Sequence, residues 1–376
     1  MDQNRQRNPK SLSGGNYMLI GIDANEANVK DRVGSNQFAY QILRSLHKLD
    51  KENSYRVYLK DIPQKDLPPE NSKWQYQVIK PGFFWTQWRL PLSLFINKPR
   101  PKIFLTLGHY APRFSPIPSI ISIMDLAFLR YKDSFKPKDL KKLTSWTKYS
   151  SKKAAHIFTI SESSKNDIRH FYKIPNSKIS VIYPAITSIT TKTSKPLFNN
   201  YLLYLGTLQP RKNLDNLIKA FSHVSLKYPK LKLILAGKKG WMYQSLFDLV
   251  QDLNLTKKVI FTGYVKPVDI QKLIKSARLF ILPSFFEGFG IPVLEAMSLR
   301  VPVLVANNSS LPEIVGGCGY YIKTPFGQKQ IETGIITALS DNKDQVDKIL
   351  AAKEKSLEFS WDKSANKILE VINDFN

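Results

Sequence analysis

Residues 279–295 read LFILPSFFEGFGIPVLE, and this stretch predicts a strand, a glycine-containing loop and a helix in succession. Four apolar residues suit a short buried strand, and Pro292 suits the first turn of a helix. Gly288 and Gly290 allow the backbone of the loop to approach a bound group closely. The N–H groups that begin a helix have no partner inside it and attract anions. The stretch therefore predicts an anion site at the carboxyl end of a strand.

Two carboxylates flank this loop, with seven residues between them. Glu287 directly precedes Gly288, and Glu295 falls in the first turns of the predicted helix. One carboxylate can face a cleft beside phosphate groups while the other accepts hydrogen bonds from ribose hydroxyls. The alternative is that Glu295 only complements the helix dipole and that Glu287 only ends a turn.

Outward from this stretch, short apolar runs alternate with segments of helical period, which is typical of an α/β fold with parallel sheets. The runs predict strands at 17–23, 55–59, 103–107, 119–124, 156–160, 179–183, 201–206, 231–236, 259–262, 279–282 and 301–305. Ligands of such doubly wound sheets bind beyond the carboxyl ends of the strands.

The strands fall into two series. The polar segment 187–200, which has no periodicity, separates them and predicts a linker. We therefore expect two doubly wound domains, residues 17–190 and 199–358, after a flexible basic segment, 1–16. Residues 359–376 contain one more amphipathic helix that must dock on a neighbour. A ligand would lie in a cleft between the two domains.

A second strand exit carries cations. Residues 204–213 read YLGTLQPRKN, in which a strand ends at Gly206 and a helix begins near Asn213. Arg211 and Lys212 at such a position could clamp a diphosphate and stabilise its departure. The alternative is two solvated loop cations.

Three further signals are weaker. Gly34 opens the first long helix, and Gly237 follows a strand end within a flexible GKKG sequence. The segment 310–313, SLPE, matches a capping box at a helix start, and capping alone would explain it.

The composition excludes several classes of protein. Hydrophobic residues make up 43% and charged residues 23% of the 376 residues, so the chain is neither disordered nor fibrous. The single cysteine, Cys318, excludes a disulfide framework and a four-cysteine zinc site. No apolar run is long enough to span a bilayer and the start has no apolar signal region, so we expect a cytoplasmic protein.

The net charge of +26 is distributed unevenly. Residues 1–198 carry 33 basic and 14 acidic residues, whereas 199–376 carry 23 and 16. The first half is therefore expected to face a polyanion or an anionic membrane, unless the lysines only solvate the surface. Nucleic acid is not expected, because the cations are scattered and no aromatic RNA-binding signature accompanies them.

Together these segments resemble the retaining glycosyltransferases of family 4, which have the GT-B fold. The resemblance covers roughly residues 20–372. The Glu-x7-Glu motif at Glu287 and Glu295 is its most specific part, followed by GTLQPRKN, by TISESSKNDI at 159–168 and by SSLPEI at 309–314. The stretch FFWTQWRLP at 83–91, followed by TLGHYAP, is similar to the branch that contains bacterial mannosyl- and rhamnosyltransferases of surface polysaccharide assembly. The aromatics of this stretch could also simply pack inside the first domain.

The resemblance implies a role for each site residue. The second domain would hold a nucleoside diphosphate sugar, and the first would hold the acceptor. Arg211 and Lys212 would bind the diphosphate, Glu295 the ribose, and Glu287 would lie against the donor sugar. The remaining donor contacts would come from the backbone at Gly34, Gly206, Gly237, Gly288, Phe289 and Gly290.

The resemblance also implies a mechanism. The anomeric configuration would be retained by front-face attack, with the leaving phosphate helping to take the acceptor proton. No metal and no resident cofactor would be needed, and the sequence contains no Asp-x-Asp tripeptide. The final helix would pack back on the first domain. GDP-mannose is the favoured donor, and a saccharide or polyprenyl-diphosphate-linked saccharide is the expected acceptor, used in the cytoplasm or at the inner face of the plasma membrane.

One position departs from the family pattern. Relatives commonly have His before Asp near the reacting sugar, whereas this chain reads Met124–Asp125. A thioether cannot donate a proton. Either His109 covers part of that role or activity is reduced, which leaves open a non-catalytic sugar-nucleotide-binding homologue. A GT-B-type nucleotide-sugar epimerase is the same-fold alternative.

Overall fold

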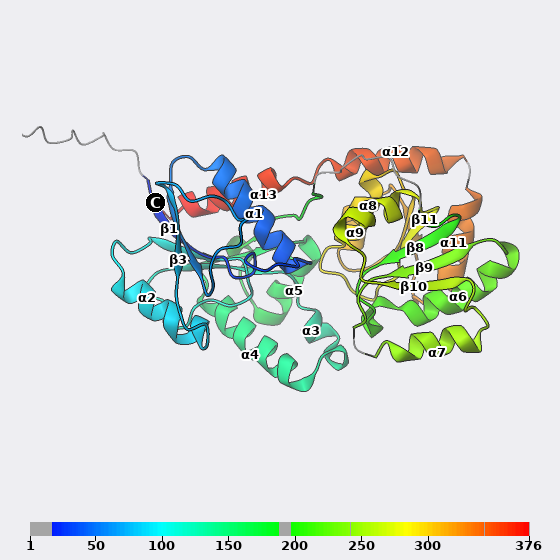
Figure 1. The fold of residues 1–376 in the computed structure, drawn as a ribbon, viewed down its shortest axis with the longest axis horizontal. Coiled ribbons are helices and arrows are strands. Elements are labelled where there is room, and N and C mark those ends of the chain that lie inside the picture. Colours follow the sequence, from blue (N-terminus) through cyan, green and yellow to red (C-terminus); the bar gives the residue numbers. More distant parts are fainter. Residues whose placement is uncertain (1–16, 188–196, 241, 342, 376) are drawn as a thin grey trace, which may run out of the picture.

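The computed structural model describes residues 17–187, 197–240, 242–341 and 343–375. The expected basic segment 1–16 and most of the expected linker lie outside the described residues. Two parallel sheets with helices around them form two Rossmann-like domains side by side (Figure 1). The predicted fold class is therefore confirmed.

The first sheet has seven strands in the order β3-β2-β1-β4-β5-β6-β7. These are β1 (Leu19–Asp23), β2 (Ser54–Leu59), β3 (Trp74–Val78), β4 (Ile103–Thr106), β5 (Ser119–Ile123), β6 (His156–Thr159) and β7 (Ile179–Val181). In the middle of the sheet, Ile22 of β1 pairs with Val57 of β2 and with Leu105 of β4. All five residues of β5 are buried, as expected for a parallel strand that is covered on both faces.

The second sheet has six strands in the order β10-β9-β8-β11-β12-β13. These are β8 (Tyr201–Leu205), β9 (Lys232–Ala236), β10 (Val259–Gly263), β11 (Leu279–Leu282), β12 (Val303–Ala306) and β13 (Tyr320–Ile322). In both sheets the strand order reverses in the middle, beside β1 and β8. A doubly wound sheet binds its ligand at such a reversal.

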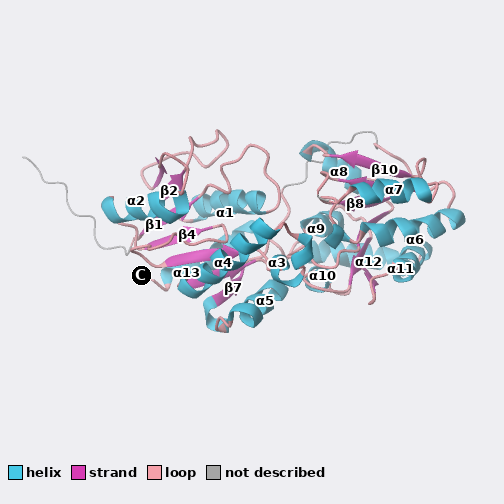
Figure 2. Ribbon diagram, turned by 90° about the horizontal axis from the view of Figure 1, so that it is seen from below, coloured by secondary structure: helices cyan, strands magenta, loops and turns pink. Residues whose placement is uncertain are grey.

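Helices cover both sheets (Figure 2). The first domain has α1 (Ser35–Leu49), the π-helical turn η1 (Trp85–Arg89), α2 (Leu90–Ile96), α3 (Ala127–Arg130), η2 (Lys132–Ser134), α4 (Pro137–Lys153), α5 (Glu162–Tyr172) and η3 (Asn176–Lys178). The second has η4 (Pro210–Lys212), α6 (Leu214–Lys227), α7 (Gln244–Asp252), α8 (Pro267–Lys275), α9 (Ile291–Ser298), α10 (Leu311–Val315), α11 (Gln328–Ser340) and α12 (Asp344–Ser356). No helix in the described part of the chain is both long enough and apolar enough to cross a bilayer.

The last helix, α13 (Trp361–Asn373), lies against α1 of the first domain (Figure 1). The Asp362 carboxylate accepts hydrogen bonds from Ser45 at 2.9 Å and from Lys48 at 2.6 Å. The Trp361 ring packs edge-on against Phe38 at a centroid distance of 5.8 Å. Helix α13 therefore packs on the first domain, although the second domain precedes it in the sequence.

Two strands have no counterpart in the sequence prediction. β3 reads WQYQV and lies at the edge of its sheet, so only Trp74 is buried and no apolar run marks it. β13 has three residues and is also an edge strand. An edge strand such as β3 needs fewer apolar side chains, because part of its surface faces water. β13 is buried at two of its three positions and was missed because it is too short to form an apolar run.

Candidate active site

The two motif segments of the second domain come together at the strand reversal. β8 pairs with β11, so the residues that follow these two strands leave the same edge of the sheet as neighbours. Arg211 and Lys212 follow β8 in the turn η4, and Glu287 follows β11. The Phe285 amide donates to the Arg211 carbonyl at 2.9 Å, which joins the two segments through their backbones.

Glu287 lies at the centre of this site. Its Oε1 is 2.5 Å from Lys212 Nζ and accepts a hydrogen bond from Ser284 at 2.6 Å. Its Oε2 is 3.6 Å from a guanidinium nitrogen of Arg211, which also donates to the Phe286 carbonyl at 2.8 Å. Burial alone would raise the pKa of Glu287, but the charges of Lys212 and Arg211 outweigh burial and hold this pKa below its ordinary value. Glu287 is therefore ionised, with Lys212 and Arg211 beside its two carboxylate oxygens.

Serines that follow β12 hold the Glu287 loop. The Glu287 amide donates to Ser309 Oγ at 3.0 Å. The Ser310 hydroxyl lies 3.0 Å from the Glu287 carbonyl oxygen and 2.7 Å from that of Phe289. The capping-box interpretation of 310–313 is therefore wrong, since Ser310 makes no side-chain capping bond. Its hydroxyl instead contacts the carbonyl oxygens of Glu287 and Phe289 and so holds residues 288–290, which we call the GFG loop.

The glycines of this loop are required by what surrounds them. Gly290 precedes α9 with a φ of +116°, and Pro292 occupies the first turn of that helix. A Cβ on Gly288 would lie 2.6 Å from Oδ2 of Asp125, which belongs to the first domain. The loop therefore contacts the opposite domain, and α9 lies on the side that faces it (Figures 1 and 2).

Glu295 lies in α9 and has a different environment from Glu287. The carboxylate of this partly buried residue makes no hydrogen bond or ion pair with the residues that the structure describes. Burial raises its pKa to about 7. An unpaired carboxylate of this kind is available to accept hydrogen bonds from a ligand hydroxyl.

The first domain contributes His109 and Asp125. His109 follows β4, and its Nε2 accepts a hydrogen bond from the Met124 amide at 3.3 Å. Its Nδ1 is buried and has no hydrogen-bond partner among the described residues. Burial lowers the pKa of His109, although Asp125 opposes this shift. A neutral ring whose Nε2 accepts must carry its proton on Nδ1, so that Nδ1 is an unused donor.

The remaining predicted glycines have different surroundings. A Cβ on Gly237 would lie 2.0 Å from the carbonyl oxygen of Gly206, so this glycine is explained by the close approach of the chain after β8 to the chain after β9. Gly34 precedes α1 with a φ of +51°, and nothing lies within 4 Å of where its Cβ would be. The backbone at the start of α1 is therefore open.

Sequence reasoning missed residues that join the two domains. Glu313 Oε2 accepts a hydrogen bond at 3.0 Å from the Glu162 amide, at the start of α5. Burial raises the pKa of Glu313 to about 7. The Tyr131 hydroxyl donates to the Phe285 carbonyl at 2.8 Å. Tyr131 lies in no motif, and the SLPE motif does not predict the contact of Glu313, because the partners of both residues are more than 150 positions away in the sequence.

A carboxylate beside Gly108 was also missed. Glu26 follows β1, accepts a hydrogen bond from Asn36 at 2.7 Å, and lies 3.6 Å from where a Cβ on Gly108 would be. The strand-exit rule that identified Arg211 applies equally to Glu26 and could have found it.

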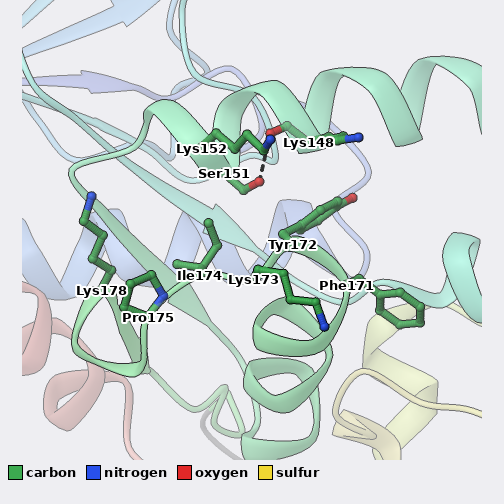
Figure 3. Close-up of a pocket in the computed structure, with 9 residues that line it drawn as sticks. All are labelled: Lys148, Ser151, Lys152, Phe171, Tyr172, Lys173, Ile174, Pro175 and Lys178. Atoms are coloured by element: carbon green, nitrogen blue, oxygen red, sulfur yellow. Dashed lines mark hydrogen bonds between the residues drawn. The ribbon is translucent and has the colours of Figure 1, made fainter.

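A cavity of about 540 Å³ lies outside this site, between α4 and the end of α5 (Figure 3). Four lysines line it: Lys148, Lys152, Lys173 and Lys178. None of the site residues predicted from the sequence contributes to it.

Comparison with known proteins accounts for both domains. The family described as "Glycosyltransferase Family 4" matches residues 34–188, and the family described as "Glycosyl transferases group 1" matches residues 185–355. O-antigen chain mannosyltransferase RfbU of Salmonella typhimurium is 30% identical over 253 residues, which cover 67% of this chain and 69% of that protein. The chain belongs to this glycosyltransferase family. The resemblance inferred from the motifs is thus confirmed.

Two further proteins resemble this chain. O-antigen chain mannosyltransferase B of Escherichia coli is 32% identical over 230 residues, which span 57% of this chain and only 59% of that relative. Sucrose-phosphate synthase from Thermosynechococcus elongatus superposes with a TM-score of 0.74 at 16% identity, covering 95% of this chain and 98% of the other. At that identity the superposition establishes the GT-B fold and nothing finer.

Proposed function

We propose that this glycosyltransferase moves a hexose, with mannose favoured, from a nucleoside diphosphate sugar to a saccharide, with retention of configuration. The observation that carries the proposal is the buried cluster of Glu287, Lys212 and Arg211 at the strand reversal. The favoured sugar rests on relatives that are named mannosyltransferases, and the donor we propose for this chain is GDP-mannose.

The second domain is suited to bind the donor. Arg211 and Lys212 supply positive charge for a diphosphate, and the amides of Gly288, Phe289 and Gly290 lie in the adjoining loop. Glu295 offers an unpaired carboxylate for the ribose hydroxyls. Gly34 leaves the backbone open at the start of α1. Gly206 and Gly237 allow the chain segments that follow β8 and β9 to pack closely.

Charge on the leaving diphosphate is the main quantity to be stabilised when the glycosidic bond breaks. Arg211 and Lys212 would act there, and Glu287 holds Lys212 in place through its carboxylate. The same carboxylate would lie beside the sugar as its anomeric carbon becomes positive. These cations supply the role that a divalent ion has in other transferases, so we propose a metal-independent reaction.

The first domain would bind the acceptor. Asp125 reaches the GFG loop, and His109, which accepts a hydrogen bond from the Met124 amide, would take over part of the contact to the reacting sugar that the Met124 thioether cannot make. The acceptor we propose is a growing glycan, carried by a polyprenyl diphosphate or free, in surface polysaccharide synthesis at the cytoplasmic face of the membrane.

Met124 favours a second candidate, a sugar-nucleotide-binding protein without transferase activity. A nucleotide-sugar epimerase is a third candidate on the same fold. One experiment separates them. The purified protein is first incubated with GDP-, UDP-, ADP- and dTDP-sugars, because a bound ligand raises the melting temperature. The sugar nucleotide that binds is then supplied with and without a saccharide acceptor, and the products are analysed by mass spectrometry and by NMR of the anomeric carbon.

We expect stabilisation by one class of nucleotide and an acceptor-dependent product of unchanged anomeric configuration. Binding without turnover would support the non-catalytic candidate, and a changed sugar nucleotide without acceptor would support the epimerase. A product of inverted configuration, or no binding of any sugar nucleotide, would overturn the proposal.

A further inference from the structure

The segment 83–96, which forms η1 and α2, exposes a continuous row of large apolar side chains. Trp85 and Trp88 both lie in the aromatic stretch 83–91, but the structure gives the two side chains different environments. Trp85 is 2% exposed and packs in the core, whereas Trp88 is 66% exposed. The exposed members of the segment are Phe83, Phe84, Trp88, Leu92, Phe95 and Ile96. We call this surface the 83–96 face.

The helical geometry of the segment explains how it has two apolar sides. Leu90 and Leu94 point inward and join Trp85 in a buried cluster with Tyr58 and Phe104. Trp88, Leu92 and Ile96 recur every four residues and therefore lie along the opposite, solvent side. The inner row already anchors the segment to its domain. The outer row is therefore not needed to anchor the segment.

The 83–96 face is far from the contact between the domains. α2 lies at the end of the first domain that points away from the second (Figures 1 and 2). The Phe114 side chain, also exposed, lies on a loop that reaches the segment, because the Arg113 amide donates to the Thr86 carbonyl at 3.3 Å. Apolar surface of this extent on a soluble domain usually marks a docking site.

Charge around the face identifies its partner. Residues 71–124 contain seven Lys and Arg residues and no Asp or Glu. Six of the seven are exposed: Lys73, Lys80, Arg89, Lys98, Arg100 and Lys102. The Arg100 guanidinium lies 5.6 Å from the ring centre of Phe95, so cation and aromatic ring share one surface. Aromatic and aliphatic side chains among Lys and Arg are the composition of elements that lie in the interface of an anionic bilayer.

We propose that the 83–96 face inserts into the interfacial layer of an anionic membrane and holds the first domain there. A second copy of the chain is disfavoured as the partner, because the exposed Lys and Arg residues of this segment in two copies would bring like charges together. The use of this membrane contact for lipid-linked acceptors rests on the proposed function. Membrane binding itself does not depend on activity.

The test compares two triple variants of the full chain. The first, Trp88→Ser/Leu92→Ser/Ile96→Ser, removes apolar side chains from the 83–96 face. The matched control, Leu226→Ser/Val268→Ser/Val346→Ser, removes three exposed apolar side chains from helices of the second domain. Circular dichroism and melting temperature verify that both variants fold.

Binding is measured by sedimentation with vesicles of phosphatidylcholine and phosphatidylglycerol, at about 0.1 M and about 0.5 M salt. We expect the wild type and the control to bind at both salt concentrations, and the face variant to partition at least about tenfold more weakly. Equal partitioning of the two variants would overturn the proposal. So would a change in molecular mass of the face variant without lipid, since that would make a second copy the partner.

Two further readouts complete the test. Lipids brominated on their acyl chains should quench Trp88, so that Trp88→Phe loses part of the quenching while it still binds; no such loss would contradict insertion. Transfer to a water-soluble saccharide should be the same in the face variant and the wild type. Absence of transfer in the wild type would count against the proposed function, while the vesicle result would still decide the membrane surface.

Discussion

Lys212 Nζ lies 2.5 Å from Glu287 Oε1, although 75 residues separate them in the sequence, and both side chains are only 10% exposed. An ion pair of this kind is stabilising only while both partners are present, because either charge alone would be buried without compensation. The pair therefore couples the folding of the second domain to the geometry of its proposed diphosphate site.

Removal of one partner should cost both stability and rate. We expect Glu287→Ala and Lys212→Ala each to lower the free energy of unfolding by about 3 to 5 kcal/mol. If Arg211 and Lys212 act on the leaving diphosphate, Arg211→Ala should lower kcat roughly 100- to 1,000-fold and weaken donor binding much less. Steady-state kinetics and chemical denaturation measure the two effects, with Lys230→Ala as a control at an exposed lysine.

Arg211→Ala is the most informative of these variants, because Arg211 is less buried than Lys212 and its loss leaves the pair intact. If folded Arg211→Ala and folded Glu287→Ala both keep a kcat near that of the wild type, the cluster is not the active site.

Glu295 should make donor binding depend on pH. Its pKa of about 7 is raised from an ordinary 4.5, so the carboxylate that accepts ribose hydrogen bonds is lost as pH falls below about 7. A sugar nucleotide has no titrating group in this range, and its Kd should be roughly tenfold weaker at about pH 6 than at about pH 8. Titration calorimetry of the donor at several pH values measures the slope. Glu295→Gln should abolish it, and Glu295→Ala should mainly raise the donor KM.

The same group affects stability in the opposite direction. Between about pH 4.5 and about pH 7 the folded chain holds a proton that the unfolded chain releases. The contribution of Glu295 to stability is therefore largest at low pH and is lost as pH rises to about 7. Wild type and Glu295→Gln should differ in this part of their stability profiles; identical profiles would show that the carboxylate is not shielded from water.

His109 should act as a neutral hydrogen-bond donor at the reacting sugar. Loss of one hydrogen bond to the reacting sugar typically costs about 1 to 3 kcal/mol, so His109→Phe should lower kcat roughly 10- to 100-fold. Because burial lowers the pKa of His109, this difference should not change between neutral and alkaline pH. Met124→Leu, at the adjacent position, serves as a control and should retain activity. An effect of Met124→Leu as large as that of His109→Phe would indicate disturbed packing instead of a lost donor.

Chelation should leave the activity intact. Arg211 and Lys212 provide the positive charge at the proposed diphosphate site, so dialysis against EDTA should preserve most of the turnover. The measurement is the transfer rate before dialysis, after it, and after addition of manganese. Complete loss that manganese restores would show that a metal takes part.

The sequence by itself determined the two-domain fold and the segments of the site. Apolar runs located eleven of the thirteen strands that the structure describes, because buried parallel strands need continuous apolar residues. The strand-exit rule and the glycines around Phe289 singled out Arg211, Lys212 and Glu287 before any contact was known. β3 was missed because an edge strand can have little apolar surface, and β13 because it has only three residues.

Only the tertiary structure decided how these residues are used. Glu287 meets Lys212 because β8 and β11 become neighbours at the strand reversal, a pairing that no local pattern encodes. The SLPE segment reads as a cap, yet Ser310 holds the GFG loop and Glu313 reaches α5 of the other domain. Trp85 and Trp88 are alike in sequence, but the direction of one helical turn buries the first and exposes the second. Local propensity fixes secondary structure, whereas these contacts depend on which elements pack together after chain segments far apart in sequence have met.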